Sequence, residues 1–194
     1  SESKKTFQTL NPENNEPWAE VPEASEKDVD KAVKAAQKAF EGTWSKLFPK
    51  ERAKYLKAIA EQLRENAEHL GKIETIDTGK LFKETKTQAN YIAEYYDYYA
   101  GLADKVEGTV LPIDKANMQV ITTRVPIGVV AAIIPWNSQM LLTAVKLAPA
   151  LAMGNTVVIK SSELAPATLF ELGKLIEKTG IPKGVVNIIS GFGE

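Results

Sequence analysis

Three apolar runs separated by two helix-length segments constrain the fold of this chain more than any other feature. The runs that read as strands are residues 129–134, 156–160 and 185–189, and the helix-length segments between them are residues 141–152 and 167–178. Each run is almost continuously apolar instead of alternating, which is typical of strands buried on both faces of a parallel sheet. The pattern predicts an α/β fold containing half of a doubly wound parallel sheet.

The residues before this unit carry most of the charge and predict a different structure. Residues 7–10 and 19–21 alternate around an Asn-rich turn and favour a small β-hairpin. Helices are expected from residue 26 to Gly42, from Pro49, over residues 67–78 and over residues 84–103. A second, long hairpin is expected from strands at 106–111 and 118–125. We therefore expect three regions, which are a hairpin and helices at 1–105, a β-hairpin at 106–125 and the sheet unit at 126–194.

Two side-chain patterns in the helical region carry specific expectations. Ser25 and Asp28 resemble a capping box with Asp in place of Glu, and apolar residues then recur at helical spacing and predict a buried face, at Val29, Val33, Ala36 and Phe40. Five of the six tyrosines lie between residues 91 and 99. We interpret them as a packing stripe with the hydroxyls at its rim, and a recognition surface is the alternative.

Composition excludes several classes of function. A net charge of −1 and a pI of about 6.0 leave no basic surface for nucleic acid. The 194 residues contain no Cys, which excludes a disulfide scaffold, a thiolate zinc site, an iron–sulfur cluster or a cysteine nucleophile within them, and no metal site is expected. Lys146, Pro149 and Gly154 interrupt the longest apolar stretch, so no membrane span is expected. The polar N-terminus does not resemble a signal peptide, and we expect a cytoplasmic location.

Polar residues and glycines follow each predicted strand. The three segments are Pro135-Trp136-Asn137, Lys160-Ser161-Ser162-Glu163 and Ser190-Gly191-Phe192-Gly193. Ligands of open parallel sheets bind beyond the carboxyl ends of the strands, where these segments should meet. An acidic side chain there suits ribose hydroxyls, and glycines let the backbone approach a phosphate. Each segment alone has a structural explanation. The glycines can simply form a turn, Glu163 can be a carboxylate at a helix N-terminus, and Lys160 can be a solvated lysine. Their coincidence at three adjacent strand ends predicts a dinucleotide site.

These segments, joined by VKLAPALAMGNTVVI at residues 145–159, resemble the NAD(P)-dependent aldehyde dehydrogenase superfamily. The likeness extends over nearly the whole chain, because the hairpins and the charged helices also look like that family's N-terminal region. It implies a Rossmann-like coenzyme-binding fold, an aldehyde substrate, NAD or NADP as cofactor, and a homo-oligomer built with the hairpin at 106–125. The chain departs from the family at Ser161, where Pro is usual, and at Ser138-Gln139, where an aromatic–Pro pair is common.

The resemblance also implies a role for each motif residue. Asn137 would lend its amide to an oxyanion hole when a thiolate attacks the aldehyde, and the alternative is an Asn that orders the strand-to-helix turn. Lys160 and Glu163 would bind the adenosine ribose, and a Schiff-base amine is the competing chemistry for the lysine. Because Glu163 would face a 2′-phosphate, NAD+ is expected over NADP+. The remaining cofactor contacts would come from Ile134, Pro135 and Trp136 as the cleft wall, from Ser162, and from Gly193 near the pyrophosphate.

The family's reaction also needs a cysteine nucleophile and a glutamate base after the glycine motif. The resemblance therefore implies the cofactor-binding N-terminal portion of an enzyme that oxidises an aldehyde to a carboxylic acid with NAD(P)+. This portion would be inactive alone and would leave its last strand as an unpaired edge. The alternative is a noncatalytic module that binds a nucleotide or a partner subunit through the hairpin at 106–125 and the open sheet edge.

Overall fold

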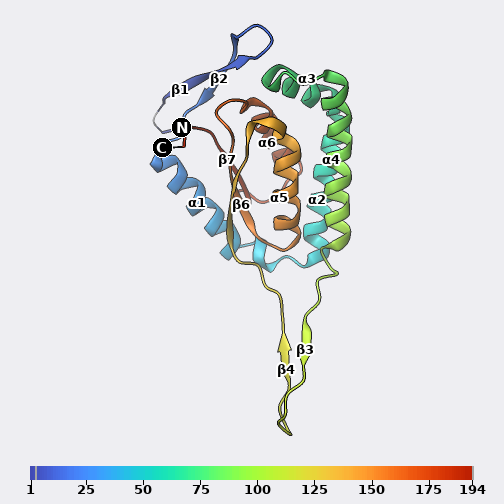
Figure 1. The fold of residues 1–194 in the computed structure, drawn as a ribbon. Helices are drawn as coiled ribbons and strands as arrows, with labels where there is room; N and C mark the ends of the chain where they lie inside the picture. Colours follow the sequence, from blue (N-terminus) through green and yellow to red (C-terminus); the bar gives the residue numbers. More distant parts are fainter. Residues whose placement is uncertain (3, 194) are drawn as a thin grey trace.

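The parallel sheet expected from the sequence is present in the computed structural model, which describes residues 1–2 and 4–193. Its strands are β5 (Val129–Ile133), β6 (Thr156–Lys160) and β7 (Val186–Ile189), and they lie in that order, all parallel (Figure 1). Helix α5 (Gln139–Ala152) connects β5 to β6, and α6 (Ala167–Lys178) connects β6 to β7. This arrangement confirms the predicted β-α-β-α-β unit.

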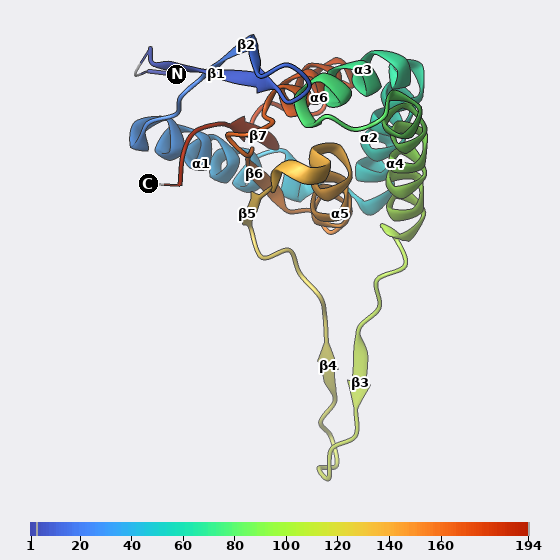
Figure 2. The same cartoon turned by 45° about the horizontal axis from the view of Figure 1, so that its top comes forward.

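Helices cover both faces of the sheet. Helix α1 (Glu26–Glu41) packs on one face, and α5 and α6 pack on the other. An outer layer packs on α5 and α6 (Figure 2), and it consists of α2 (Pro49–Glu65), α3 (Ala67–Thr78) and α4 (Phe82–Leu102). One cluster of buried apolar side chains runs through both layers and the sheet, from Trp44 through Tyr96 to Ile159. The charged N-terminal helices and the sheet therefore share one core.

Hydrogen bonds also tie the N-terminal helices to the sheet unit. Trp44 Nε1 donates to the carbonyl oxygen of Asn155 at 2.9 Å, although the two residues are 111 positions apart. Arg52 Nε donates to the carbonyl oxygen of Ala152 at 3.1 Å, and its Nη1 donates to Leu47 at 2.6 Å. The half-buried Arg52 guanidinium thus satisfies a carbonyl at the end of α5, where the helix can no longer do so.

The buried face of α1 differs from the expectation. The capping box is present, since the Ser25 N–H donates to Asp28 Oδ2 at 2.9 Å. Val29 and Val33, however, are 40% and 42% exposed, so their assignment to the buried face is wrong. The buried side chains of the helix are Ala32, Ala36 and Ala39. These small residues let α1 approach the strands so closely that Thr156 Oγ1 donates to the carbonyl oxygen of Ala36 at 3.1 Å.

Two antiparallel hairpins flank the packed body. Strands β1 (Thr6–Asn11) and β2 (Glu16–Pro22) pair beside α3, whereas β3 (Thr109–Leu111) and β4 (Val120–Thr122) form an arm that extends away from the body (Figures 1 and 2). The paired part of the arm is shorter than predicted, with three residues on each strand. No described element packs on either face of the arm, so no buried side-chain contacts stabilise a longer paired ladder. Within the described residues, no helix is both long and apolar enough to cross a membrane.

The tyrosines of α4 confirm the packing interpretation only for part of the cluster. Tyr96 is fully buried in the shared core. Tyr91 and Tyr98 are 53% and 63% exposed, and the Tyr95 ring contacts the rings of Tyr91 and Tyr99 at centroid distances of 6.3 and 5.6 Å. Because successive tyrosines fall on different sides of the helix, one enters the core and the others form a partly exposed aromatic row.

Candidate functional site

The three segments that follow the strands lie side by side at one end of the sheet. The pairing register places Ile133 beside Lys160, and Lys160 beside Ile189. Beyond the strands, the Ile134 N–H donates to the carbonyl oxygen of Lys160 at 3.0 Å, and the Ser161 N–H donates to that of Ile189 at 2.9 Å. These bonds bring the Pro135–Asn137, Lys160–Glu163 and Ser190–Gly193 segments to the same edge, as the sequence predicts.

Lys160 and Glu163 form an ion pair in the turn after β6. Lys160 Nζ lies 3.2 Å from Glu163 Oε2, and the two side chains are 24% and 36% exposed. A hydrogen bond from the residue's own backbone N–H is the main cause that lowers the pKa of Glu163; burial opposes it and Lys160 adds to it. The site therefore presents a carboxylate at neutral pH. An ammonium held in an ion pair is a poor nucleophile, which argues against a Schiff-base role for Lys160.

A hollow of about 380 Å³ opens beside this pair, between the ends of β6 and β7 and the start of α1. Its lining combines strand-end residues with residues from α1 and its cap, and includes Lys160, Ser190, Gly191, Phe192, Ser25, Glu26 and Val29. Gly191 has a φ of 152°, at the limit of the region that favours glycine, where the chain leaves β7. Sequence reasoning missed the contribution of Ser25, Glu26 and Val29, because only the tertiary fold brings α1 to this edge.

The other proposed cofactor residues have varied surroundings. Ile134 is buried, Trp136 is 51% exposed and Pro135 is exposed. Ser162 is buried, and its Oγ accepts a hydrogen bond from the Leu164 N–H at 3.2 Å. At Gly193, a Cβ would meet no described atom within 4 Å, so nothing in the described part of the chain requires a glycine there.

Asn137 lies in a single 3-10 turn, η2 (Trp136–Ser138), between β5 and α5. Its side chain is exposed, and within residues 1–2 and 4–193 its amide makes no hydrogen bond. The next residue, Ser138, accepts a hydrogen bond from Lys80 Nζ, which lies 3.6 Å from Oε1 of the buried Glu74. Burial raises the pKa of Glu74 to about 7, against the opposing effect of Lys80. Sequence reasoning missed Lys80 and Glu74, since no motif marks either residue.

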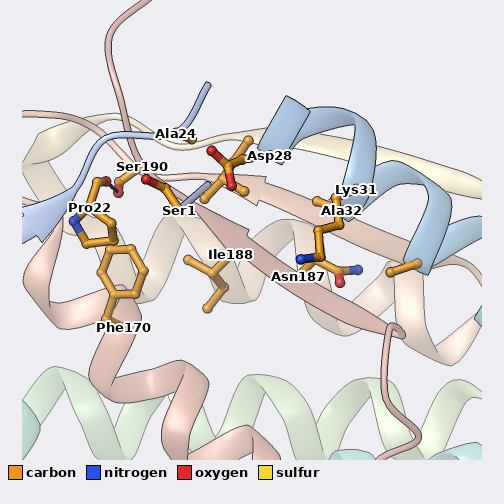
Figure 3. A pocket seen from close by; sticks show the side chains of 12 residues that line it. Ser1, Pro22, Ala24, Asp28, Lys31, Ala32, Phe170, Asn187, Ile188 and Ser190 are labelled. Atoms are coloured by element: carbon orange, nitrogen blue, oxygen red, sulfur yellow. Dashed lines mark hydrogen bonds between the residues drawn. The ribbon is translucent and has the colours of Figure 1, made fainter. Parts of the chain in front are cut away.

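A second hollow, of about 320 Å³, lies along the open edge of β7 (Figure 3). Phe170 from α6 and Ile188 from β7 form its apolar part, and Asp28 and Lys31 from α1 border it (Figure 3). The Asp28 carboxylate is already engaged in the helix cap, and the Ser25 N–H is the main cause that lowers its pKa to about 2. This hollow therefore has the character of an uncovered sheet edge. Across the described chain, no group of three or more His, Cys, Asp or Glu is placed to hold a metal ion.

Known proteins resemble this chain along its whole length. A sequence model described as the aldehyde dehydrogenase family matches residues 1–194. The (Z)-2-((N-methylformamido)methylene)-5-hydroxybutyrolactone dehydrogenase of Acinetobacter baylyi is 53% identical over 188 residues, which cover 96% of this chain and 38% of that protein. Betaine aldehyde dehydrogenase of Bacillus subtilis is 45% identical over 187 residues, again 38% of its length. The chain thus spans about 38% of the length of these curated relatives.

Solved structures show the same relationship in three dimensions. A point mutant of betaine aldehyde dehydrogenase from Staphylococcus aureus, solved in complex with NAD+, superposes with a TM-score of 0.95 at 39% identity. The match covers 100% of this chain and 39% of that one. An aldehyde dehydrogenase mutant from Bacillus cereus gives a TM-score of 0.94 at 40% identity, covering 98% of this chain and 39% of the other. With the family model matching throughout, the chain belongs to the aldehyde dehydrogenase family.

Proposed function

We propose that these residues form the cofactor-binding portion of an NAD(P)-dependent aldehyde dehydrogenase that oxidises an aldehyde to a carboxylic acid. The observation that carries the proposal is the convergence of the Lys160–Glu163 pair and the Asn137 turn at one end of the parallel sheet. Residues 1–105 and 126–194 would build this portion together, and the hairpin at 106–125 would serve homo-oligomer assembly. A cytoplasmic location stays a prediction.

The residues at the strand ends fit a dinucleotide. The charged Glu163 carboxylate is an acceptor for ribose hydroxyls, and it stands beside a hollow of about 380 Å³. We assign the ribose to Lys160, Ser162 and Glu163, the neighbourhood of the pyrophosphate to Gly193, and the cleft wall to Ile134, Pro135 and Trp136. The Staphylococcus aureus relative was solved in complex with NAD+, which supports a nicotinamide dinucleotide as the cofactor. When bound, the nicotinamide cofactor supplies the hydride acceptor of the reaction.

Asn137 would stabilise the negative charge on the substrate oxygen. Its exposed amide is free of partners in the described structure and lies at the carboxyl end of β5, where it can donate to an oxygen that becomes an oxyanion. The charge arises when a thiolate attacks the aldehyde carbon. No Cys occurs in these 194 residues, so the thiolate would come from elsewhere in the complete enzyme, and we expect this portion alone to oxidise no aldehyde.

The test measures NADH formation by the complete enzyme with NAD+ and a panel of aldehydes. Asn137→Ala should lower kcat about 100- to 1000-fold, because one oxyanion donor is lost, and should leave the dissociation constant for NAD+ unchanged. Asn90→Ala, at an exposed asparagine on α4, is the matched control. No NADH from the complete enzyme would favour the noncatalytic module instead. A wild-type kcat in Asn137→Ala would leave Asn137 as a structural turn residue.

A further inference from the structure

Lys80 connects helix α3 to the turn that carries Asn137. Lys80 follows Gly79, which ends α3 with a φ of 76°, in the left-handed region that lets the chain turn out of a helix. From there, Lys80 Nζ donates a hydrogen bond to Ser138 Oγ and lies 3.6 Å from Glu74 Oε1. A side chain from the α3–α4 connection therefore reaches the residue next to Asn137.

The buried Glu74 lies on the core side of the Lys80 ammonium and holds it in place. The Glu74 side chain has 0% exposure, compared with 27% for Lys80. Neither carboxylate oxygen of Glu74 accepts a hydrogen bond from any described residue. A buried carboxylate without donors is unfavourable unless a cation compensates it, and Lys80 is placed to do so. The lysine is thus held between the buried Glu74 carboxyl group and the Ser138 hydroxyl, instead of moving freely in solvent.

The turn that carries Asn137 is anchored on two sides. Towards the sheet, the Ile134 N–H donates to the carbonyl oxygen of Lys160 at 3.0 Å. Towards α3, Ser138 Oγ accepts the hydrogen bond from Lys80. Ser138 has a φ of −166° and a ψ of 67°, so its backbone is not helical and does not continue α5 through the turn. Without the Lys80 link, the turn would keep its anchor at β5 and lose the one at Ser138.

We propose that Lys80, supported by Glu74, is a positioning residue that holds Asn137 in place to stabilise the oxyanion. This inference rests on the proposed function, since it concerns the role of Asn137 in that reaction. Ser138 makes the link possible because its hydroxyl lies one bond beyond Cβ, within reach of the lysine.

A double-mutant cycle in the complete enzyme tests the inference. Lys80→Met and Ser138→Ala each remove the link, and each should lower kcat about 10- to 100-fold while the KM for the aldehyde changes less than about threefold. In the Asn137→Ala background neither change should lower kcat further, because the residue that they position is gone. Lys80→Arg keeps a donor and should restore part of the rate. Lys83→Met, at an exposed lysine of α4, is the matched control and should keep the wild-type kcat.

Wild-type kcat in both link variants, or equal losses with and without Asn137, would overturn the positioning role. Melting temperature and NAD+ affinity, measured for every variant, show whether it folds. If Lys80→Met fails to fold, Ser138→Ala decides the result, because it leaves the Glu74–Lys80 pair intact. A wild-type enzyme inactive on every aldehyde would overturn the proposed function and this role with it. An active enzyme with additive losses would overturn this role alone.

Discussion

Glu163 determines the expected choice between NAD+ and NADP+. Its carboxylate is charged and lies 3.2 Å from Lys160, so a 2′-phosphate would meet one like charge and one opposite charge. Repulsion at about 5 Å amounts to roughly 3 kcal/mol per charge unit at an effective dielectric near 20, and Lys160 offsets much of it. We expect a net preference for NAD+ of about 1 to 3 kcal/mol, or roughly 5- to 150-fold in dissociation constant.

Fluorescence titration of the complete enzyme with both cofactors measures this preference. Glu163→Gln keeps the shape of the side chain, removes its charge and should reduce the preference. Glu177→Gln changes an exposed carboxylate of α6, away from the strand ends, and should leave the preference for NAD+ unchanged. Equal affinities in the wild-type enzyme, or tighter NADP+, would show that Lys160 governs the choice.

Glu74 should make the stability of the fold depend on pH. Burial raises the pKa of Glu74 from 4.5 to about 7, so the folded state binds this proton more tightly than the unfolded state. The resulting stability is fully present below pH 4.5 and is lost as pH rises through 7, and it amounts to about 3 kcal/mol at most. Glu74→Gln removes this titration. The difference between its melting temperature and that of the wild type should therefore be more favourable to the variant at pH 8 than at pH 5.

The control is Glu84→Gln, at an exposed carboxylate of α4, which should show no such dependence on pH. A constant difference between pH 5 and pH 8 for Glu74→Gln would contradict the expectation.

At the scale of single residues, position relative to a strand end decides what the sequence can predict. Lys160 and Glu163 follow an apolar strand directly, so their meeting with Gly191 at the sheet edge follows from the topology of a parallel sheet. Glu74 and Lys80 carry no such marker. Their importance depends on burial by α3 and on contact with a turn far along the chain, and neither is encoded by local spacing.

At the scale of elements, the order and type of helices and strands could be predicted, but not all of their faces. The sequence places Val29 and Val33 on the buried side of α1 because apolar side chains usually mark it. The side chains that face the sheet are instead those in line with Ala36, because small side chains allow close contact between a helix and strands. Val29 then becomes available at the hollow beside Lys160.

The β3–β4 arm should control assembly of the complete enzyme. Val110 and Ile121 are direct cross-strand partners and are 61% and 59% exposed, so their apolar side chains are available to another subunit. Val110→Asp combined with Ile121→Lys places opposite charges across the pair, which preserves the hairpin but should weaken assembly. Val110→Ile combined with Ile121→Val keeps the apolar surface and serves as the control. Light scattering after size exclusion measures the mass, and an unchanged mass in the charged variant would contradict an assembly role.

At the scale of the whole molecule, the open edge of β7 predicts self-association of the isolated 194-residue chain. The strand lacks a neighbour on one side within the described structure, and Phe170 and Ile188 line the apolar hollow along it. Sedimentation velocity on the chain carrying the two charged arm substitutions separates this edge from the arm. We expect the sedimentation coefficient to rise with concentration. A monodisperse monomer with a cooperative melt would instead support the alternative of an independent module.

The bonds that join the outer helices to the sheet unit also affect how the chain can fold during synthesis. Trp44 and Arg52 find their acceptors at Asn155 and Ala152, which are 111 and 100 positions later in the sequence. At about 5 to 20 residues per second, a ribosome needs roughly 5 to 20 seconds to make the intervening segment. In the later part of that interval, once residue 102 has been made, α2 and α4 are complete but lack α5, and the apolar arm is made before α5. The nascent chain therefore exposes apolar surface that chaperones can bind, first on the helices and then on the arm.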